Sequence, residues 1–364
     1  MRALLLGFGN VGRGVADILV RRDQYPGLAA LDVDVVGIVT GAHGALVNRR
    51  GLDLARVLAD WSRQGGFAPS HPDHADLGAL EAIRAVPCDV VVELTPLTRR
   101  AQGEPAITHV REALRRGRHV VTANKGPLAW AFPDLASESA RRGRHLLYET
   151  TVMDGVPVFN LARHGLRGAT VARIEGILNS TTNAILCALE RGEAFADALA
   201  RAQREGYAEA DPSDDLEGWD AAVKLAALAR VLMGAALAPE RVAREGISGL
   251  DPSRIAAARA RGARLKLVCE AWREGGSVRG RVALREVRLD DPFALVDETS
   301  SILRLVTDLA GSVVVTEERP DIHVTAYGVI SDLLTLSSAA PPRPRRERPA
   351  TGAGARSRRP RRAR

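Results

Sequence analysis

Residues 2–20, RALLLGFGNVGRGVADILV, join a short apolar strand, a glycine-rich turn and an amphipathic helix. Gly7, Gly9 and Gly12 form the pattern G-x-G-x-x-G between strand and helix, which is the context of a dinucleotide-binding turn. The first glycine permits the tight turn, the second lets the backbone approach a pyrophosphate, and the third allows close packing of helix on strand. The helix N-terminus attracts the anion. The predicted cofactor contacts in this turn are Gly7, Phe8, Gly9, Asn10, Val11 and Gly12.

The chain up to about residue 150 repeats this alternation of strand and helix. Apolar, β-branched runs occur at 3–6, 33–39, 89–94, 119–123 and 145–149. Apolar strands that alternate with helices are typical of a parallel sheet covered on both faces. The sequence therefore predicts an α/β fold for residues 1–150, a Rossmann-type dinucleotide-binding domain.

The pattern changes after residue 150. Strands are predicted at 171–178, 265–272 and 277–289, with alanine-rich helices between them. A late amphipathic helix is predicted at 321–336. This mixture predicts a second, α+β domain over residues 151–319.

Composition narrows the class of protein. A chain of 364 residues is long enough for two domains, and no apolar run approaches the roughly 18 residues that span a bilayer. The N-terminus has no small-residue cleavage site, so we interpret it as a strand and not as a signal peptide. The cysteines are odd in number and widely spaced, which argues against disulfides or a zinc site and favours a reducing cytoplasm. They are Cys88, Cys187 and Cys269.

The net charge of +7 comes from the last residues. Residues 341–364 hold ten arginines and one glutamate, and the rest of the chain has 41 basic against 43 acidic residues. No apolar residue in this Arg-rich tail is larger than alanine, so we expect it to be disordered. It is either a solvated extension or an arm that binds nucleic acid without specificity.

The end of the second strand bears on the choice between NAD and NADP. An acid there usually binds the ribose 2′-hydroxyl of NAD, yet Asp32 and Asp34 lie at the start of the strand and residues 39–43 contain no acid. Arg49 and Arg50 follow. The pattern favours NADP, with NAD left open.

Two further motifs lie after predicted strands. Lys125 ends the motif TANK at the carboxyl end of a strand, where the ligand crevice of an open α/β sheet lies. It either meets a ligand or is a solvated loop lysine. The run 179–183, NSTTN, either caps the helix after it or holds a polar substrate.

The segment 206–224, GYAEADPSDDLEGWDAAVK, holds six carboxylates between Glu209 and Asp220. Asp220 and Lys224 are four residues apart on a predicted helix and share one face. They form either a surface ion pair or, because the neighbouring residues are apolar, a buried acid–base pair.

This segment resembles the signature of the homoserine dehydrogenase family. The matching positions are Ala202-x3-Gly206-Tyr207-Ala208-x2-Asp211-Pro212-x2-Asp215-Leu216-x-Gly218-x-Asp220-x3-Lys224. The resemblance covers residues 1 to about 337, with further matches in the fingerprint turn and at 91–96, 122–125, 149–157, 177–183 and 325–334. The chain resembles a short form, without a fused kinase or a clear ACT domain. Ser180 stands where the family commonly has glycine, and the Arg-rich tail is outside the family pattern.

The resemblance implies the reversible NAD(P)H-dependent reduction of L-aspartate 4-semialdehyde to L-homoserine, a step of threonine and methionine biosynthesis. It also implies a cytoplasmic homodimer, with residues 151–319 as the catalytic and dimerisation domain and residues 320–337 returning to the first domain. The implied roles are proton donor for Lys224, catalytic partners for Asp220 and Lys125, substrate ligands for Glu209, Asp215 and Asp220, and cofactor contacts for Thr95, Lys125, Gly206 and Gly328.

The resemblance further implies a monovalent cation, Na⁺ or K⁺. Its ligands would be Glu149 and the backbone carbonyls of Val152, Asp154 and Val156. Asp154 replaces a smaller residue that many relatives carry.

Two alternatives remain at this stage. One is another two-domain NAD(P)-dependent oxidoreductase, such as an aspartate dehydrogenase or a semialdehyde dehydrogenase. The latter needs a nucleophilic cysteine, and no cysteine here lies in a recognisable nucleophile context. The other is a non-catalytic NADP-sensing or DNA-binding protein, which would have no need of Asp220 and Lys224.

Overall fold

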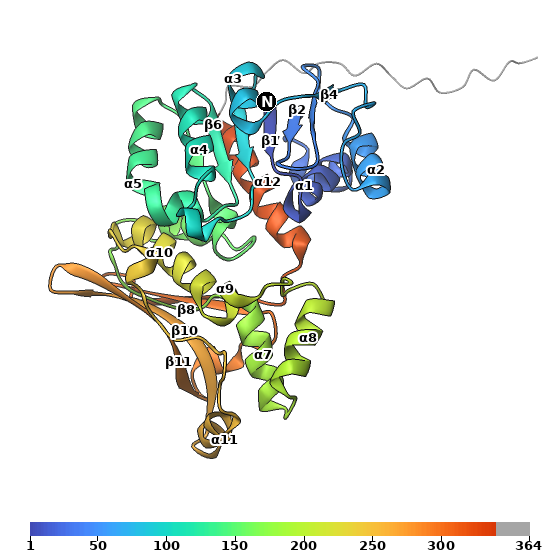
Figure 1. The fold of residues 1–364 in the computed structure, drawn as a ribbon. Helices are drawn as coiled ribbons and strands as arrows, with labels where there is room; N and C mark the ends of the chain where they lie inside the picture. Colours follow the sequence, from blue (N-terminus) through green and yellow to red (C-terminus); the bar gives the residue numbers. More distant parts are fainter. Residues whose placement is uncertain (340–364) are drawn as a thin grey trace, which may run out of the picture.

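The computed structural model describes residues 1–339, so the prediction for the Arg-rich tail lies outside the described residues. The chain forms two lobes, each built on its own sheet (Figure 1). The first sheet has the order β4-β3-β2-β1-β5-β6-β7. Its strands are β1 (Arg2–Leu6), β2 (Asp34–Val39), β3 (Ala45–Val47), β4 (His74–Ala75), β5 (Val90–Glu93), β6 (His119–Thr122) and β7 (Leu146–Leu147).

The first sheet is parallel over its five predicted strands, as expected, but its β2 edge is not. Strands β3 and β4 were not predicted; β3 pairs antiparallel to β2, and β4 pairs antiparallel to β3. Only a short turn joins β2 to β3, with the Thr40 amide donating to the Gly44 carbonyl at 3.1 Å. A parallel pairing would need a crossover of a dozen residues or more, so this edge is antiparallel.

Helices cover both faces of the first sheet. They are α1 (Asn10–Val20), α2 (Leu54–Gln64), α3 (Ala79–Ala85), α4 (Ala106–Arg115), α5 (Gly126–Arg141) and the C-terminal α12 (Ile322–Ala339). Successive β1 residues face opposite cores: Leu5 packs with α1 and α12, whereas Leu4 and Leu6 pack with α3, α4 and α5. Helix α12 also lies against α1. The last helix therefore completes the layer that the first one begins.

The fingerprint turn has the backbone that its glycines require. Gly7 has φ +103°, and a Cβ there would lie 2.7 Å from the Leu94 carbonyl oxygen. A Cβ on Gly12 would lie 2.9 Å from the Gly7 oxygen, whereas one on Gly9 would have no heavy atom within 4 Å. Gly7 and Gly12 are thus fixed by the fold, while the space above Gly9 is open.

The second sheet has the order β13-β12-β8-β10-β11-β9. Its strands are β8 (Val171–Ile177), β9 (Ala243–Arg244), β10 (Ala263–Glu274), β11 (Ser277–Arg288), β12 (Ser301–Thr307) and β13 (Ser312–Glu317). Strands β8, β10 and β11 were predicted; β9 and the β12–β13 hairpin were not. The helices of this lobe are α7 (Ser180–Glu190), α8 (Phe195–Arg204), α9 (Ser213–Leu216), α10 (Trp219–Met233) and α11 (Pro252–Ala260).

Helix α10 lies between the two lobes. It packs on β8, β10 and β11 and also contacts α5 of the first lobe (Figure 1). Nine of its fifteen residues are buried, which agrees with the apolar surroundings predicted for Lys224. Among the helices of residues 1–339, none is both long and apolar enough to cross a membrane.

Candidate active site

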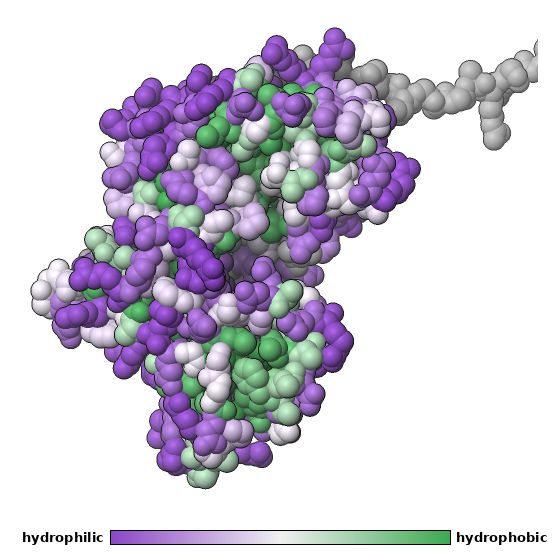
Figure 2. Space-filling view, viewed as in Figure 1, coloured by the Kyte–Doolittle hydropathy of each residue, from purple (hydrophilic) through white to green (hydrophobic). Residues whose placement is uncertain are grey.

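Three predicted residues meet where the lobes join. Lys125 precedes α5 in the first lobe, and Asp220 and Lys224 lie one turn apart on α10. Lys125 Nζ is 2.8 Å from Asp220 Oδ1, and Lys224 Nζ is 3.2 Å from Asp220 Oδ2. One carboxylate is therefore held between two ammonium groups. The molecular surface is hollowed between the lobes in this region (Figure 2).

The charges in this cluster fix its protonation. Burial alone would raise the pKa of Asp220, but Lys125 and Lys224 hold it well below its usual range. Burial would lower the pKa of Lys224, but nearby carboxylates, Asp220 foremost, raise it above its ordinary value. At neutral pH the cluster thus contains an ionised Asp220 and a protonated Lys224, which is the state of a proton donor.

Asn179 connects the start of α7 to this cluster. Its Oδ1 accepts from the Thr182 amide at 2.9 Å, which caps the helix. Its Nδ2 donates to Asp215 Oδ1 at 2.8 Å and to Asp220 Oδ2 at 3.0 Å. The capping interpretation of the NSTTN motif is therefore confirmed, and the same side chain also hydrogen-bonds two carboxylates of the cluster; binding of a polar substrate by the motif stays a prediction.

Asp215 is the second carboxylate of the cluster. Thr181 Oγ1 donates to it at 3.0 Å. Burial, and then the charge of Asp220, raise the pKa of Asp215. Lys224 also donates to the Leu178 carbonyl at 2.7 Å, so α7, α9 and α10 all hold the site.

The remaining predicted substrate and cofactor residues lie around this cluster or apart from it. Thr95 follows β5, and its carbonyl accepts from Asn124 Nδ2 at 2.9 Å, beside Lys125. Gly206 ends α8 with φ +82° and open space above it. The Glu209 side chain is exposed, and within residues 1–339 no contact joins its carboxylate to the Lys125–Asp220–Lys224 cluster.

The predicted cation ligands lie in the segment 149–156, directly under α12. A Cβ on Gly328 of α12 would lie 2.8 Å from the Asp154 carbonyl oxygen. Glu149 is buried and accepts from the Phe159 and Asn160 amides at 2.6 and 3.0 Å. Burial raises the pKa of Glu149 to about 7.

Asp332 is a residue that the sequence analysis missed. It is buried on α12, its Oδ2 accepts from the Glu149 amide at 3.0 Å, and burial raises its pKa to about 7. An acid within the otherwise apolar face of the helix at 321–336 was the signal that would have found it.

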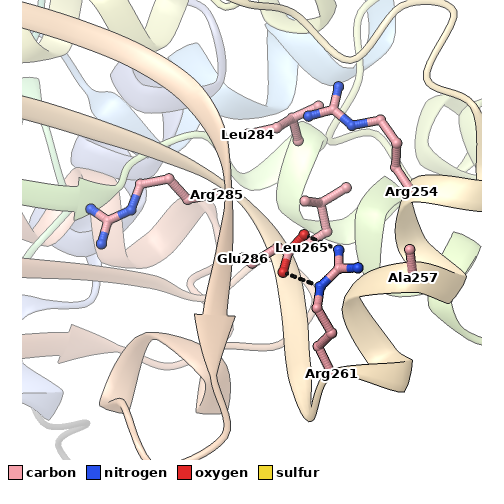
Figure 3. A pocket seen from close by; sticks show the side chains of 7 residues that line it. All are labelled: Arg254, Ala257, Arg261, Leu265, Leu284, Arg285 and Glu286. Atoms are coloured by element: carbon pink, nitrogen blue, oxygen red, sulfur yellow. Dashed lines mark hydrogen bonds and ion pairs between the residues drawn. The ribbon is translucent and has the colours of Figure 1, made fainter.

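A separate hollow of about 480 Å³ lies between α11 and the β10–β11 hairpin. Figure 3 shows Arg261 paired with Glu286 across it, while Arg285 points away towards the other face of the sheet. Arg254 on its rim is also paired, with Glu245 at 2.9 Å. None of the predicted site residues lines it, so we place the candidate active site between the lobes.

Comparisons with known proteins agree with this geometry. Residues 7–149 match the family model of the homoserine dehydrogenase NAD-binding domain, and residues 157–334 match the homoserine dehydrogenase model. The chain is 35% identical to an NAD⁺-dependent homoserine dehydrogenase of Pseudomonas canavaninivorans, over 92% of this chain and 96% of that protein. It is also 35% identical to a homoserine dehydrogenase of Methanocaldococcus jannaschii, over 92% and 98%. The chain belongs to the homoserine dehydrogenase family.

Solved structures of homoserine dehydrogenases share the fold. That of Thermoplasma acidophilum superposes with a TM-score of 0.80 at 26% identity, covering 93% of this chain and 99% of that one. A hyperthermophilic archaeal homoserine dehydrogenase in complex with NADPH superposes with a TM-score of 0.78 at 25% identity, covering 93% and 98%. The two-domain α/β fold and the oxidoreductase class predicted from the sequence are confirmed.

Asn179 provides a test of the site. Asn179→Asp keeps the capping oxygen but replaces the amide donor with a third carboxylate beside Asp215 and Asp220. We expect kcat/KM for homoserine oxidation to fall by at least about tenfold, because the added charge repels both neighbours. Asn179→Ser, which keeps a cap without the charge, is the control and should retain more activity. Equal activity of the Asp variant and the unmodified enzyme would contradict the role of the amide.

Proposed function

We propose that this chain interconverts L-aspartate 4-semialdehyde and L-homoserine at the Lys125–Asp220–Lys224 cluster. The observation that carries the proposal is the largely buried carboxylate held between two ammonium groups where the cofactor lobe meets the second lobe. When bound, the nicotinamide cofactor supplies the hydride for the reduction. The reaction then needs a proton and positive charge at the carbonyl oxygen.

Lys224 is the proton donor in this proposal, because it is protonated and one turn from Asp220. Lys125 supplies a second positive charge beside the oxygen, and Asp220 orients both lysines. Asp215 and Glu209 are the proposed partners of the substrate's polar groups. Glu209 lies in the exposed segment between α8 and α9.

Both alternative functions are less compatible with the site. Burial raises the pKa of Cys88 to about 11 and that of Cys269 to about 12, the reverse of what a nucleophilic thiol needs. Cys187 is buried as well. A sensing protein would have no use for a buried Asp220–Lys224 pair, since an unneeded buried ion pair gives little stability.

The proposed cofactor is NADP. The turn after β2 holds no acid. His43 of this turn and Arg13 of α1 lie against the same ring: Arg13 Cζ is 5.6 Å from the centre of the Trp61 ring, and the His43 ring centre is 5.3 Å from it. Both groups are available to attract a 2′-phosphate. A relative named as NAD⁺-dependent and another in complex with NADPH keep both cofactors open for the family.

We also propose a monovalent cation held by Glu149 and the carbonyls of Val152, Asp154 and Val156. Glu149 and Asp332 lie together as buried carboxylates whose pKa values burial raises to about 7, so a positive charge beside them would be favourable. The ligand atoms are all hard oxygens, which suit Na⁺ or K⁺. The cation would order the segment 149–156 under α12. Within residues 1–339 no group of three or more His, Cys, Asp or Glu suits another metal.

We propose that the protein is a homodimer formed through the six-stranded sheet, with the domain limits given above. Helices α7, α10 and α11 cover one face of this sheet. On the other face, the short helix η7 (Pro292–Leu295) covers part of β10 and β11 and leaves Leu295 77% exposed.

Sedimentation equilibrium should give twice the chain mass; a monomer at all concentrations would contradict this proposal.

Lys224→Ala tests the mechanism. We expect kcat to fall about a hundredfold or more while cofactor still binds, because the alkoxide loses its proton donor. In the unmodified enzyme, homoserine oxidation should speed up as pH rises towards the raised pKa of Lys224, since only the neutral amine accepts a proton. The variant should lose this pH limb. Near-normal turnover in the variant would remove Lys224 from the mechanism.

Thr40→Asp tests the cofactor preference. The new carboxylate at the end of β2 would repel a 2′-phosphate, so kcat/KM should shift from NADP towards NAD by about tenfold or more. Thr40→Asn, of the same size without the charge, is the control and should shift it far less. An unmodified enzyme that already favours NAD tenfold would contradict our interpretation of this strand end.

A further inference from the structure

The loop after β5 reaches from the cofactor lobe to the second lobe through Arg99. This loop begins with Thr95 and continues into the short helix η3 (Arg99–Ala101). Arg99 Nε donates to Asp214 Oδ1 at 2.8 Å, and its Cζ lies 4.3 Å from the centre of the Trp219 ring. Trp219 immediately precedes Asp220. One arginine therefore joins the loop that carries Thr95 to the helix that carries the catalytic carboxylate.

Trp219 is held from behind by the second lobe itself. Arg244 Cζ lies 3.4 Å from the centre of the same ring, and Arg244 Nε donates to the Glu217 carbonyl at 3.1 Å. A Cβ on Gly246 would lie 2.4 Å from the Leu216 carbonyl oxygen, so the two backbones are in direct contact. The start of α10 is thus fixed to its own lobe, and Arg99 is the residue of the other lobe that contacts Trp219.

The Arg99 contacts are not of a kind that contributes much to folding. The Asp214 side chain is 48% exposed, and ion pairs of such exposure add little to stability. The effect of the Arg99 contacts is geometric, because a planar guanidinium that both stacks on an indole and binds a carboxylate has few orientations open to it. Hydride transfer depends steeply on such geometry: a displacement of about 1 Å can cost a hundredfold in rate.

We propose that Arg99 is a positioning residue for hydride transfer. By docking the Thr95 loop on Trp219 and Asp214, it sets the distance between the nicotinamide side of the cofactor lobe and the Asp220 cluster. This inference rests on the proposed function. It adds Arg99, which lies outside the family signature, to the residues on which the reaction depends.

Arg99→Ala, with Arg100→Ala as the matched control, tests the proposal in the full chain. Arg100 is the exposed neighbour on the same turn. We expect Arg99→Ala to lower kcat about tenfold or more, with KM for the semialdehyde changed less than about threefold. The primary deuterium isotope effect from 4-deuterated reduced cofactor should rise, because hydride transfer becomes more rate-limiting. Arg99→Lys, which keeps the charge but not the planar group, should be intermediate, and Arg100→Ala should match the unmodified enzyme.

A purely structural role would lower the melting temperature and the concentration of active sites without changing the isotope effect, and that result would overturn the proposal. So would an Arg99→Ala enzyme as active as Arg100→Ala. Trp219→Leu and Asp214→Asn each remove one partner of Arg99. Each of these substitutions is combined with Arg99→Ala. The rise in activation free energy of each double variant, taken from kcat, should be smaller than the sum of the rises in the two single variants. Additive rises would show that the groups do not act together. If the proposed function fails instead, the unmodified chain itself lacks homoserine oxidation.

Discussion

The arrangement of the site depends on one largely buried carboxylate with two positive partners. The Asp220 side chain is only 15% exposed and pairs with both Lys125 and Lys224, and a lone charge in that position would be unfavourable. Lys224 is on the same helix as Asp220, whereas Lys125 comes from the first lobe, so Asp220 has both partners only when the lobes are together. The second ion pair of Asp220 therefore depends on how the lobes are arranged.

Further contacts join the lobes through the segments that flank α10. Trp130 Nε1 of α5 donates to Glu240 at 3.0 Å, and Arg99 binds Asp214 and Trp219 nearby. Helix α12 then brings the chain back to the first lobe beside α1, with Asp332 placed on the Glu149 amide. The site is therefore enclosed by segments that are far apart in sequence, at 93–125, 149–156, 178–224 and 322–332.

The sequence predicted the parts of this arrangement that have a local signal. The fingerprint turn, the five parallel strands and the pairing of Asp220 with Lys224 all follow from spacing within one element. Strands β3, β4 and β9 are two or three residues long, too short to show a period. The β12–β13 hairpin has alternation but was not recognised.

What the sequence could not show is which distant residues meet. The contact of Lys125 with Asp220 spans 95 residues and that of Arg99 with Asp214 spans 115. The family resemblance named Lys125 because the motif around it is shared. It could not name Arg99 or Trp219, because their meeting is a property of the assembled lobes and neither residue alone has an unusual context.

The presence of two lysines at one carboxylate has a chemical reason. A lysine that gives its proton to the substrate becomes neutral, and Asp220 would then be left as an uncompensated buried charge if Lys224 were its only partner. Lys125, at 2.8 Å, remains charged through that step and keeps Asp220 ionised. Asn179 adds a hydrogen bond to the same carboxylate at 3.0 Å and does not titrate. The cluster can thus lose and regain one proton at Lys224 while Asp220 stays ionised, because one positive partner remains beside it on both sides of the reaction.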